Sequence, residues 1–400
     1  MTWGKTTLGD SGTWASGGTP STTTHAYWGG DVPWMSSKSL TDFRVRDSDR
    51  RLTEIGTQNG TKLVPKDTIL MVVRGMSLKS EFRMGITQRE VAFSQDLKAL
   101  IPSADFDPLF LAYALRSRSD DVLGMVDESG HGTGRLQTDR LLALELPFPP
   151  LAEQRAISSV LGVLDDKIES NRRAIGILGA LVSSLFTQAV SSTEKKHVPL
   201  GEITSVVKGR SYKSSELEDS PTALVTLKSI DRHGGYKFDG LKPYTGPYKP
   251  GQVVEPGEIV VAQTDLTQGA EVVGRGVRVP RSTEYSTLVA SLDLAIVRPM
   301  GEMPVEYLLG LISSEGFRQH CRSHVTGTTV LHLAKDAIPT WLAPIVSLEE
   351  QQQFAVTARA LLARMDALVE ETTALSSLRH ALLPELLSGR VRCPPGGVTV

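Results

Sequence analysis

Residues 149–171 read PPLAEQRAISSVLGVLDDKIESN, and this stretch decides how the chain is built. Its start recurs at residues 346–351 as VSLEEQ. After both starts, apolar residues follow one another at spacings of about four and three, which is typical of a helix that packs in coiled-coil fashion. We therefore expect one long helix in the middle of the chain and a second near its end.

Each expected helix packs through one apolar stripe, its seam, which carries a polar residue near its middle. The seam of the first helix is predicted to comprise Ile157, Leu161, Leu164, Ile168, Asn171, Ile175 and Leu178. The seam of the second is predicted to comprise Leu361, Met365, Leu368, Thr372 and Leu375. About 35 to 40 residues at about 1.5 Å each make rods of roughly 50 to 60 Å.

The chain repeats itself outside the helices as well. The LGD at residues 8–10 resembles the LGE at 200–202, the GT at 132–133 recurs at 327–328, and the EQ at 153–154 recurs at 350–351. Similar segments in the same order indicate a tandem duplication of about half the chain.

Each half begins with a mixed globule. Residues 64–73 and 255–262 are β-branched runs introduced by turn residues, which predicts strands, whereas 108–117 and 305–314 have helical apolar spacing. The fold class is therefore α+β, with two α/β globules alternating with two long helices in a pseudo-twofold repeat. The expected domains are residues 1–148 (first globule), 149–190 (central helix), 191–197 (linker), 198–346 (second globule), 347–390 (C-terminal helix) and 391–400 (tail).

The two helices can bury their seams on each other. We expect an antiparallel pair, because the globule between the helices can return the chain to the start of the first. The alternative is that each helix packs only on its own globule. Polar seam residues such as Asn171 and Thr372 favour pairing, since they are a familiar register device in helix pairs.

Composition excludes several classes of protein. The chain has 400 residues, which is long enough for more than one core, and 40% of them are hydrophobic. Two cysteines, Cys321 and Cys393, are too few for a disulfide framework. No signal peptide and no membrane span is expected, so a cytoplasmic protein is predicted. A net charge of -2 means that any nucleic-acid contact comes from local basic patches or from partner chains.

Several strings taken together resemble the specificity (S) subunits of type I restriction-modification systems. They are GGTPS at 17–21, YWGGDVPW at 27–34, PLAEQ at 150–154, LDDKI at 164–168 and LSGR at 387–390. The resemblance follows the family's domain order over the whole chain. The second half departs from it, since VSLEEQ replaces the Pro-Pro-Leu start and KGRS at 208–211 lacks the GGTP string.

The resemblance implies a function and a set of partners. Two target recognition domains would each read one half of a split, asymmetric sequence in double-stranded DNA. The helices would set the spacing and dock two methyltransferase (M) subunits, with restriction (R) subunits in the full complex. The chain itself would bind no cofactor, and S-adenosylmethionine and ATP are expected on the partner subunits.

Catalytic patterns are missing from the sequence. The pairs Pro149-Pro150 and Pro394-Pro395 are not followed by the aromatic residue that base methylation would require. His320, Cys321, His324 and His332 lack the paired spacing of a zinc site. We therefore predict neither catalytic residues nor a metal, and a chain that is not an enzyme by itself.

Candidate DNA contacts lie in loops that contain glycine, where basic and hydroxyl side chains can approach phosphates or base edges. The residues predicted to contact DNA are Thr19, Arg74, Lys79, Arg83, Thr133, Arg135, Lys208, Arg210, Tyr212, Lys213, Arg275, Thr328 and Thr329. For any one of them, a solvated surface position is an equally good interpretation. Those near residues 133 and 328 recur in both halves, which favours phosphate contact over base reading.

Two functions follow from the sequence. The first is a non-catalytic DNA specificity subunit. The second is a scaffold whose twin domains on a coiled coil bind protein partners without sequence-specific DNA recognition.

Overall fold

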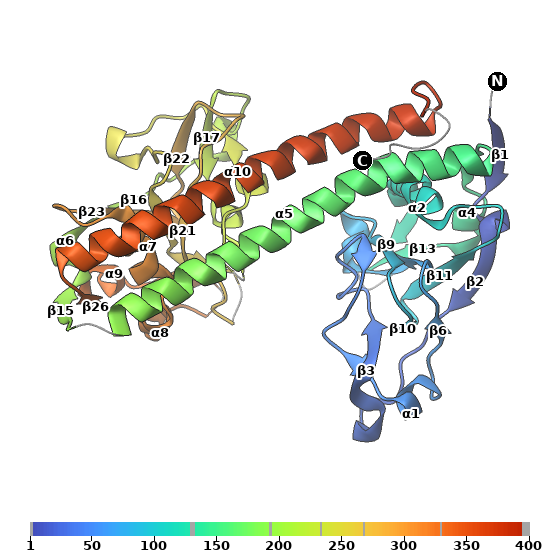
Figure 1. The fold of residues 1–400 in the computed structure, drawn as a ribbon, viewed down its shortest axis with the longest axis horizontal. Helices are drawn as coiled ribbons and strands as arrows, with labels where there is room; N and C mark the ends of the chain where they lie inside the picture. The colour runs from blue at the N-terminus through green and yellow to red at the C-terminus, as the bar shows by residue number, and fades with distance from the viewer. Residues whose placement is uncertain are drawn as a thin grey trace. The chain divides into compact units, whose positions relative to one another are not determined.

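The computed structural model describes residues 3–128, 133–191, 194–232, 234–266, 269–328 and 330–393. The chain folds as two compact units (Figure 1). Unit 1 comprises Met1–Ser170 and Thr372–Val400, and unit 2 comprises Asn171–Glu371. The division falls within both long helices, so each unit holds a globule together with one part of each helix.

The central sheet of unit 1 has five strands, and only its last strand is parallel to its neighbour. Its order is β2 (Gly12–Ser16), β11 (Leu97–Pro102), β7 (Ile69–Val72), β9 (Met84–Thr87) and β4 (Arg44–Val45). Helix α2 (Pro108–Arg116) begins where Asp107 accepts a hydrogen bond of 2.9 Å from the amide of Phe110.

Smaller sheets complete unit 1. One has the order β5 (Arg51–Leu52), β3 (Trp28–Met35), β10 (Val91–Phe93) and β6 (Leu63–Val64). A second has the order β12 (Val126–Glu128), β13 (Gly134–Leu136) and β8 (Arg74–Gly75), and a third pairs β1 (Gly4–Thr7) with β14 (Glu145–Phe148). The short helices are η1 (Gly9–Ser11), η2 (His25–Tyr27), α1 (Glu54–Thr57), η3 (Met76–Lys79), α3 (Ser119–Gly124) and α4 (Thr138–Leu142).

Unit 2 also contains several sheets. The largest has the order β16 (Thr204–Lys208), β23 (Leu294–Pro299), β19 (Ile259–Ala262) and β21 (Gly276–Arg278). A second sheet has the order β18 (Lys242–Pro243), β17 (Thr222–Val225) and β22 (Thr287–Ala290). A third has the order β20 (Thr264–Asp265), β25 (Leu331–Leu333) and β24 (Val325–Thr326). A fourth pairs β15 (Lys196–Pro199) with β26 (Leu342–Ile345).

The helices of unit 2 follow the same pattern of one helix against the main sheet and several short turns. They are α6 (Leu200–Ile203), α7 (Val305–Ser313), α8 (Glu315–Ser323), α9 (Ala337–Thr340) and the 3-10 turns η4 (Ser214–Glu216), η5 (Leu227–Ser229), η6 (Phe238–Gly240) and η7 (Pro250–Gln252).

The topology of unit 1 recurs in unit 2. The strand order β2-β11-β7-β9 corresponds to β16-β23-β19-β21, and β12-β13-β8 corresponds to β24-β25-β20. In both units the strand that enters the globule pairs with the strand that leaves it. These correspondences agree with the sequence repeat.

The strands are shorter than the sequence predicted. Residues 64–73 form two strands in different sheets, because Asp67 adopts a φ of 66° and turns the chain between β6 and β7. In the second half, β19 begins only after the turn at Gly257, whose φ is 93°. The helices predicted at 108–117 and 305–314 are present as α2 and α7.

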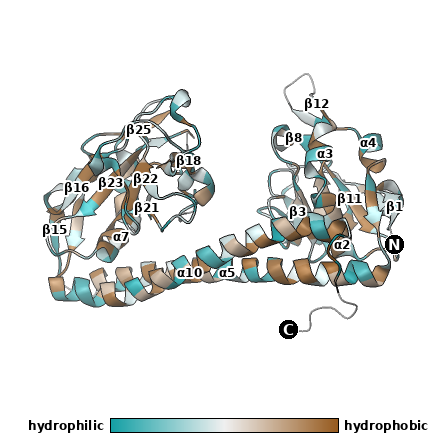
Figure 2. Cartoon of the chain, turned by 90° about the horizontal axis from the view of Figure 1, so that it is seen from above, coloured by the Kyte–Doolittle hydropathy of each residue, from teal (hydrophilic) through white to brown (hydrophobic). Residues whose placement is uncertain are grey.

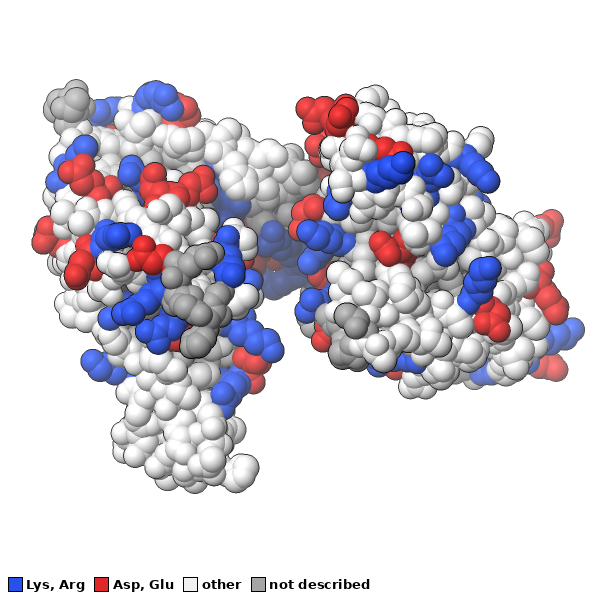
Figure 3. All heavy atoms as spheres, turned by 180° about the vertical axis from the view of Figure 1, so that it is seen from behind, with Lys and Arg blue, Asp and Glu red and all other residues white. Residues whose placement is uncertain are grey.

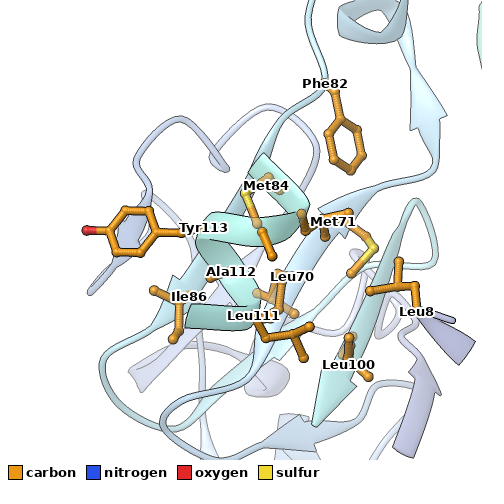
Figure 4. Close-up of a cluster of buried hydrophobic side chains, with 14 of the residues drawn as sticks. Leu8, Leu70, Met71, Phe82, Met84, Ile86, Leu100, Leu111, Ala112 and Tyr113 are labelled. Carbon is orange, nitrogen blue, oxygen red and sulfur yellow. The ribbon is translucent and has the colours of Figure 1, made fainter. Parts of the chain in front are cut away.

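The core of unit 1 lies between the main sheet and α2. Figure 4 shows Leu111 directed toward Leu100, Ile86 beside the same helix, and Tyr113 projecting away from Leu100. These four side chains are at most 2% exposed. Burial of large apolar side chains at about 1.5 to 3 kcal/mol each is the main force that holds the helix on the sheet.

The long helices are α5 (Leu151–Ser191) and α10 (Leu348–Leu387). Figure 2 shows hydrophobic and hydrophilic residues alternating along both. In unit 1, Ile157 and Leu161 of α5 share a core with Leu386 and Leu387 of α10. All twelve predicted seam residues are buried or half-buried.

In unit 2 the second half of α5 packs with the first half of α10. Val182 and Phe186 of α5 share a core with Phe354 and Leu362 of α10, and the rings of Phe186 and Phe354 lie 5.7 Å apart. Asn171 is 2% exposed, and its side-chain amide donates a 2.9 Å hydrogen bond to Glu371.

A buried charge network joins three helices of unit 1. The Tyr113 hydroxyl on α2 donates to Asp165 on α5 at 2.6 Å, and Arg379 on α10 pairs with the same carboxylate. Burial, together with the neighbouring Asp165 charge, raises the pKa of Tyr113 well above its ordinary value, so the phenol stays a donor.

The helices of both units are anchored by similar contacts. Arg44 pairs with Asp166 and donates to the carbonyl of Gly162, one turn earlier in α5. In unit 2, Arg278 pairs with Asp366 on α10 and donates to a carbonyl one turn earlier. Near the helix starts, Gln154 and Gln351 each donate to the carbonyl five residues before them, at 2.9 Å in both cases.

Helix α5 is long and apolar enough to cross a membrane by length and composition alone. No such segment was expected from the sequence. An 18-residue window of α5 has a mean hydropathy of 1.6, and 11% of it is buried. Val182 and Phe186 pack into unit 2, but Ile177 is 69% exposed and Leu181 is 43% exposed. The helix therefore offers an apolar surface beyond its packed face.

The adjacent carboxylates Asp165 and Asp166 allow a test of the buried network. Replacing Asp165 with Ala leaves Arg379 buried without its charge partner, so we expect a loss of about 3 to 5 kcal/mol in the free energy of unfolding. Replacing Asp166, whose side chain is 62% exposed, should cost about 1 kcal/mol or less. Urea unfolding, with hydrogen exchange of the α2 amides, measures both; equal losses would contradict this account.

Candidate nucleic-acid interface

Two arginines that the sequence singled out lie directly opposite each other in unit 1. Strands β8 and β13 are antiparallel, and Arg74 is in register with Arg135. Both residues are exposed, and within the described part of the chain neither guanidinium has an ion pair or a side-chain hydrogen bond. Like charges opposite each other destabilise a strand pair, so a bound anion would stabilise this one.

The turn η3 extends this patch. Leu78 packs against Gly134 so closely that a Cβ there would lie 2.7 Å from the Leu78 Cβ, and the exposed Lys79 follows. Arg74, Lys79 and Arg135 are named here the unit 1 basic patch. Asp127 on β12 is in register with Arg135, but its ion pair is with Arg140 at 3.1 Å. Three cations without an ion pair of their own in the described residues suit phosphate.

Other predicted residues of unit 1 have structural partners. Arg83 forms an ion pair of 2.9 Å with Glu81. Thr19 donates a 2.5 Å hydrogen bond to Gln95 and so fixes the loop that precedes β3. Thr133 is half-buried at the start of β13. Arg83 and Thr19 are therefore at least partly engaged within unit 1.

The predicted loop of unit 2 is held close to its sheet. A Cβ at Gly209 would lie 2.1 Å from the carbonyl of Ser291, and the Arg210 amide donates to Ala290 at 2.7 Å. The Nε atom of Arg210 is buried and has no hydrogen bond. Lys208, at the end of β16, is exposed.

The last residues of this loop, Tyr212 and Lys213, mainly stabilise the local fold. Tyr212 packs on the small core around Leu224, and Lys242 donates to its hydroxyl at 3.4 Å. The Lys213 amide donates to Glu216 at 2.8 Å and so begins η4, while its side chain is exposed.

Arg275 belongs to a cluster of arginines, of which only Arg275 was predicted from the sequence to contact DNA. Its Nε donates to the carbonyl of Glu271 at 2.7 Å, and Arg318 donates to the same carbonyl at 3.3 Å. Arg322 donates to the carbonyl of Ala270 at 3.2 Å. Burial lowers the pKa of Arg275, and the charges of Arg318 and Arg322 lower it further. Three cations thus converge on one turn.

A sequence signal for this cluster existed. Arg318 and Arg322 are four residues apart on α8, which places them on one face of that helix. The Glu271 carboxylate pairs with Arg232 at 3.4 Å, so the cluster also contains acidic groups. It is therefore a mixed surface with an excess of positive charge.

The equivalent strand pairs of the two units carry different residues. Where Arg135 faces Arg74 in unit 1, His332 faces Thr264 in unit 2. Thr328 is exposed in the turn before β25, and Thr329 lies outside the described residues. The two units therefore share a fold but differ in the residues at these positions, which could contact a ligand.

Figure 3 shows one face of the molecule, on which Lys and Arg side chains form separate groups with Asp and Glu between them. This distribution agrees with the net charge of -2. On this face, positive charge therefore lies in local patches.

Cys321 is a free, buried cysteine. Burial raises the pKa of Cys321 to about 12, so this thiol is not a nucleophile at neutral pH. Among the described residues, no group of three or more His, Cys, Asp or Glu side chains could hold a metal ion.

Residues 1–176 match the family model of the type I restriction modification DNA specificity domain. The specificity subunit of the type I restriction enzyme EcoR124I/EcoR124II of Escherichia coli is 30% identical over 161 residues, which cover 40% of this chain and 40% of that protein. The MjaVIII specificity subunit of Methanocaldococcus jannaschii is 19% identical over 413 residues, covering 98% of this chain and 93% of that protein.

The fold resembles that of a type I restriction-modification S subunit from M. genitalium, with a TM-score of 0.60 and 18% identity over 96% of each chain. The first of these curated relatives is matched over only two fifths of its length. The first 176 residues thus match the model of a type I DNA specificity domain, and the chain is similar to the specificity subunits of type I restriction-modification systems.

The unit 1 basic patch can be tested by neutralising it. Replacing Arg74 and Arg135 with Gln should weaken DNA binding by the full chain about equally for all sequences, and should lower the salt dependence by about one phosphate contact per residue. Fluorescence anisotropy over a range of salt concentrations measures both. Exposed Lys62 and Lys66, replaced with Gln, provide a control of equal charge. The same change in both variants would show only a general charge effect.

Proposed function

We propose that this chain is the non-catalytic DNA specificity subunit of a type I restriction-modification complex. Each globule acts as a target recognition domain and reads one half of a bipartite, asymmetric DNA sequence. The observation that carries the proposal is the specificity domain at residues 1–176 together with the recurrence of its sheet topology in unit 2. The differing residues at equivalent strand positions support two different half-sites.

The long helices pair antiparallel and set the distance between the half-sites. Contacts inside each unit support this. The first half of α5 shares a core with the end of α10 in unit 1, and its second half shares a core with the start of α10 in unit 2. The hydrogen bond from Asn171 to Glu371 supplies the register.

Two methyltransferase subunits dock on this chain, and restriction subunits join in the full complex. Exposed Ile177 and Leu181 on α5 support such docking, because exposed apolar side chains on one helix are typical of protein interfaces. S-adenosylmethionine and ATP bind to the partners, and the complex acts on DNA in the cytoplasm.

Exchange of one domain tests how the halves are assigned. Replacing residues 1–148 with the equivalent domain of a relative should change one half of the methylated sequence and leave the other half and the spacer unchanged. Methylome sequencing of a host that expresses the chain with its M subunit measures the outcome. A change in both halves would contradict separate reading, and methylation without any bipartite site would favour a protein scaffold.

An insertion tests whether the helices act as a ruler. Four residues added after Asn171 in α5, with four added before Glu371 in α10, lengthen both helices by about 6 Å and keep their packed faces within about 40°. Since base pairs are about 3.4 Å apart, the spacer should grow by about two base pairs.

The control for the insertion adds two residues at each place. It rotates each packed face by about 200° and should abolish folding. Methylome sequencing of the four-residue variant decides the matter, because an active protein with the original spacer would show that the helices do not set the distance.

A further inference from the structure

Arg50 of unit 1 is stacked on a pair of tryptophan rings. Its guanidinium carbon lies 3.6 Å from the ring centre of Trp28 and 5.1 Å from that of Trp34. The two rings meet edge to face, with centroids 5.3 Å apart. Stacking of this kind holds an arginine in one plane while leaving the N–H groups at its edge free to donate.

The platform under Arg50 is itself fixed. The indole of Trp34 is buried and donates to the carbonyl of Gly18 at 3.1 Å. The indole of Trp28 donates to the carbonyl of Ser21 at 3.1 Å. Arg50 is therefore oriented before any ligand arrives.

Among the residues with a described position, Arg50 differs from its neighbours in having no acidic partner. Arg44 pairs with Asp166, Arg46 with Glu169, and Arg51 with Asp47. Across the residues that the structure describes, the Arg50 guanidinium has neither an ion pair nor a hydrogen bond, and its nitrogens are not among the buried unsatisfied atoms. The N–H groups of Arg50 are therefore available to donate to a ligand at the surface.

A cavity of about 330 Å³ adjoins this guanidinium. It is lined by Trp28, Gly29, Gly30, Asp49, Arg50 and Arg51. Gly29 has a φ of 87°, which favours glycine, and a Cβ at Gly30 would lie 2.4 Å from the carbonyl of Leu52. Two residues without side chains therefore form part of the wall, which lets a flat ligand approach the backbone.

The charges around the cavity favour a base edge over a phosphate. Asp49 lines the cavity and is exposed. Asp47 forms an ion pair with Arg51, which is another residue of the lining. Carboxylates repel phosphate, whereas they can accept from the amino group of cytosine. In the unit 1 basic patch, by contrast, Asp127 lies opposite Arg135 but is paired with Arg140, which leaves Arg74, Lys79 and Arg135 available to phosphate.

We propose that Arg50 is a base-reading residue that donates to O6 and N7 of a guanine in the half-site bound by unit 1. A planar, pre-oriented guanidinium matches those two acceptors, and the arginine–guanine pair is the commonest specific contact in the major groove. This inference rests on the proposed function, since it requires that unit 1 reads DNA.

The test uses the full chain expressed with its M subunit, with methylome sequencing as the measurement. Replacing Arg50 with Ala should relax the preference for guanine at one position of one half-site and should lower methylation of the original site roughly 5- to 150-fold. Replacing it with Lys should also relax the preference, because the charge remains and the fork is lost. Lys62→Ala, which removes an exposed cation outside the cavity lining, is the control and should leave the site unchanged.

A chemical substitution in the DNA locates the contact. Each guanine of the half-site is replaced in turn by 7-deazaguanine, which lacks the N7 acceptor. One replacement should weaken binding by the wild-type protein and have little effect on Arg50→Ala, since the variant has already lost the partner. Trp28→Ala should behave like Arg50→Ala while the circular dichroism spectrum and the second half-site stay unchanged.

Other outcomes separate the two proposals. If Arg50→Ala weakens methylation equally at all sites without relaxing any position, Arg50 contacts phosphate and the base-reading role is wrong. An unchanged methylome in Arg50→Ala also overturns it while leaving the proposed function intact. If the wild-type chain with its M subunit methylates no bipartite sequence, the proposed function itself fails.

Discussion

Unit 1 depends on one buried carboxylate. Asp165 on α5 accepts from Tyr113 on α2 and pairs with Arg379 on α10, so a single group joins the globule to both long helices. A buried charge without its partners is strongly unfavourable, which means that these three helices can pack together only in the arrangement that satisfies it. The globule is thereby held at one place along α5, and its loops keep a fixed orientation on their helical support.

Unit 2 reaches a similar result with different residues. Arg278 comes from the strand equivalent to β9, whereas Arg44 comes from β4, the neighbour of β9. Both nevertheless pair with an aspartate on a long helix and with a carbonyl one turn earlier. Both units thus keep an arginine that anchors the globule on a long helix, although the arginine comes from a different strand of the sheet in each unit.

The helix anchors of the two units are similar, whereas their exposed charged residues differ. The paired strands β8 and β13 present Arg74 and Arg135, and their counterparts present Thr264 and His332, while the cations of unit 2 gather around Arg275. Packing constrains the residues that face the sheets and helices, because any change there costs burial energy. Exposed loop residues carry no such constraint, so two domains of one fold can meet different ligands.

The sequence by itself determined the two long helices, the repeat and the helices at 108–117 and 305–314, because apolar periodicity is a local property. The family resemblance came from short strings in the same order. Only the tertiary structure decided which cations are available. Arg83 and Tyr212 proved to have polar partners. Arg50, which the sequence did not single out, stacks on tryptophan rings and has no ion pair or hydrogen bond within the described part of the chain. Whether a charged side chain is free depends on residues that are distant in the chain and adjacent in space, and no local pattern records that proximity.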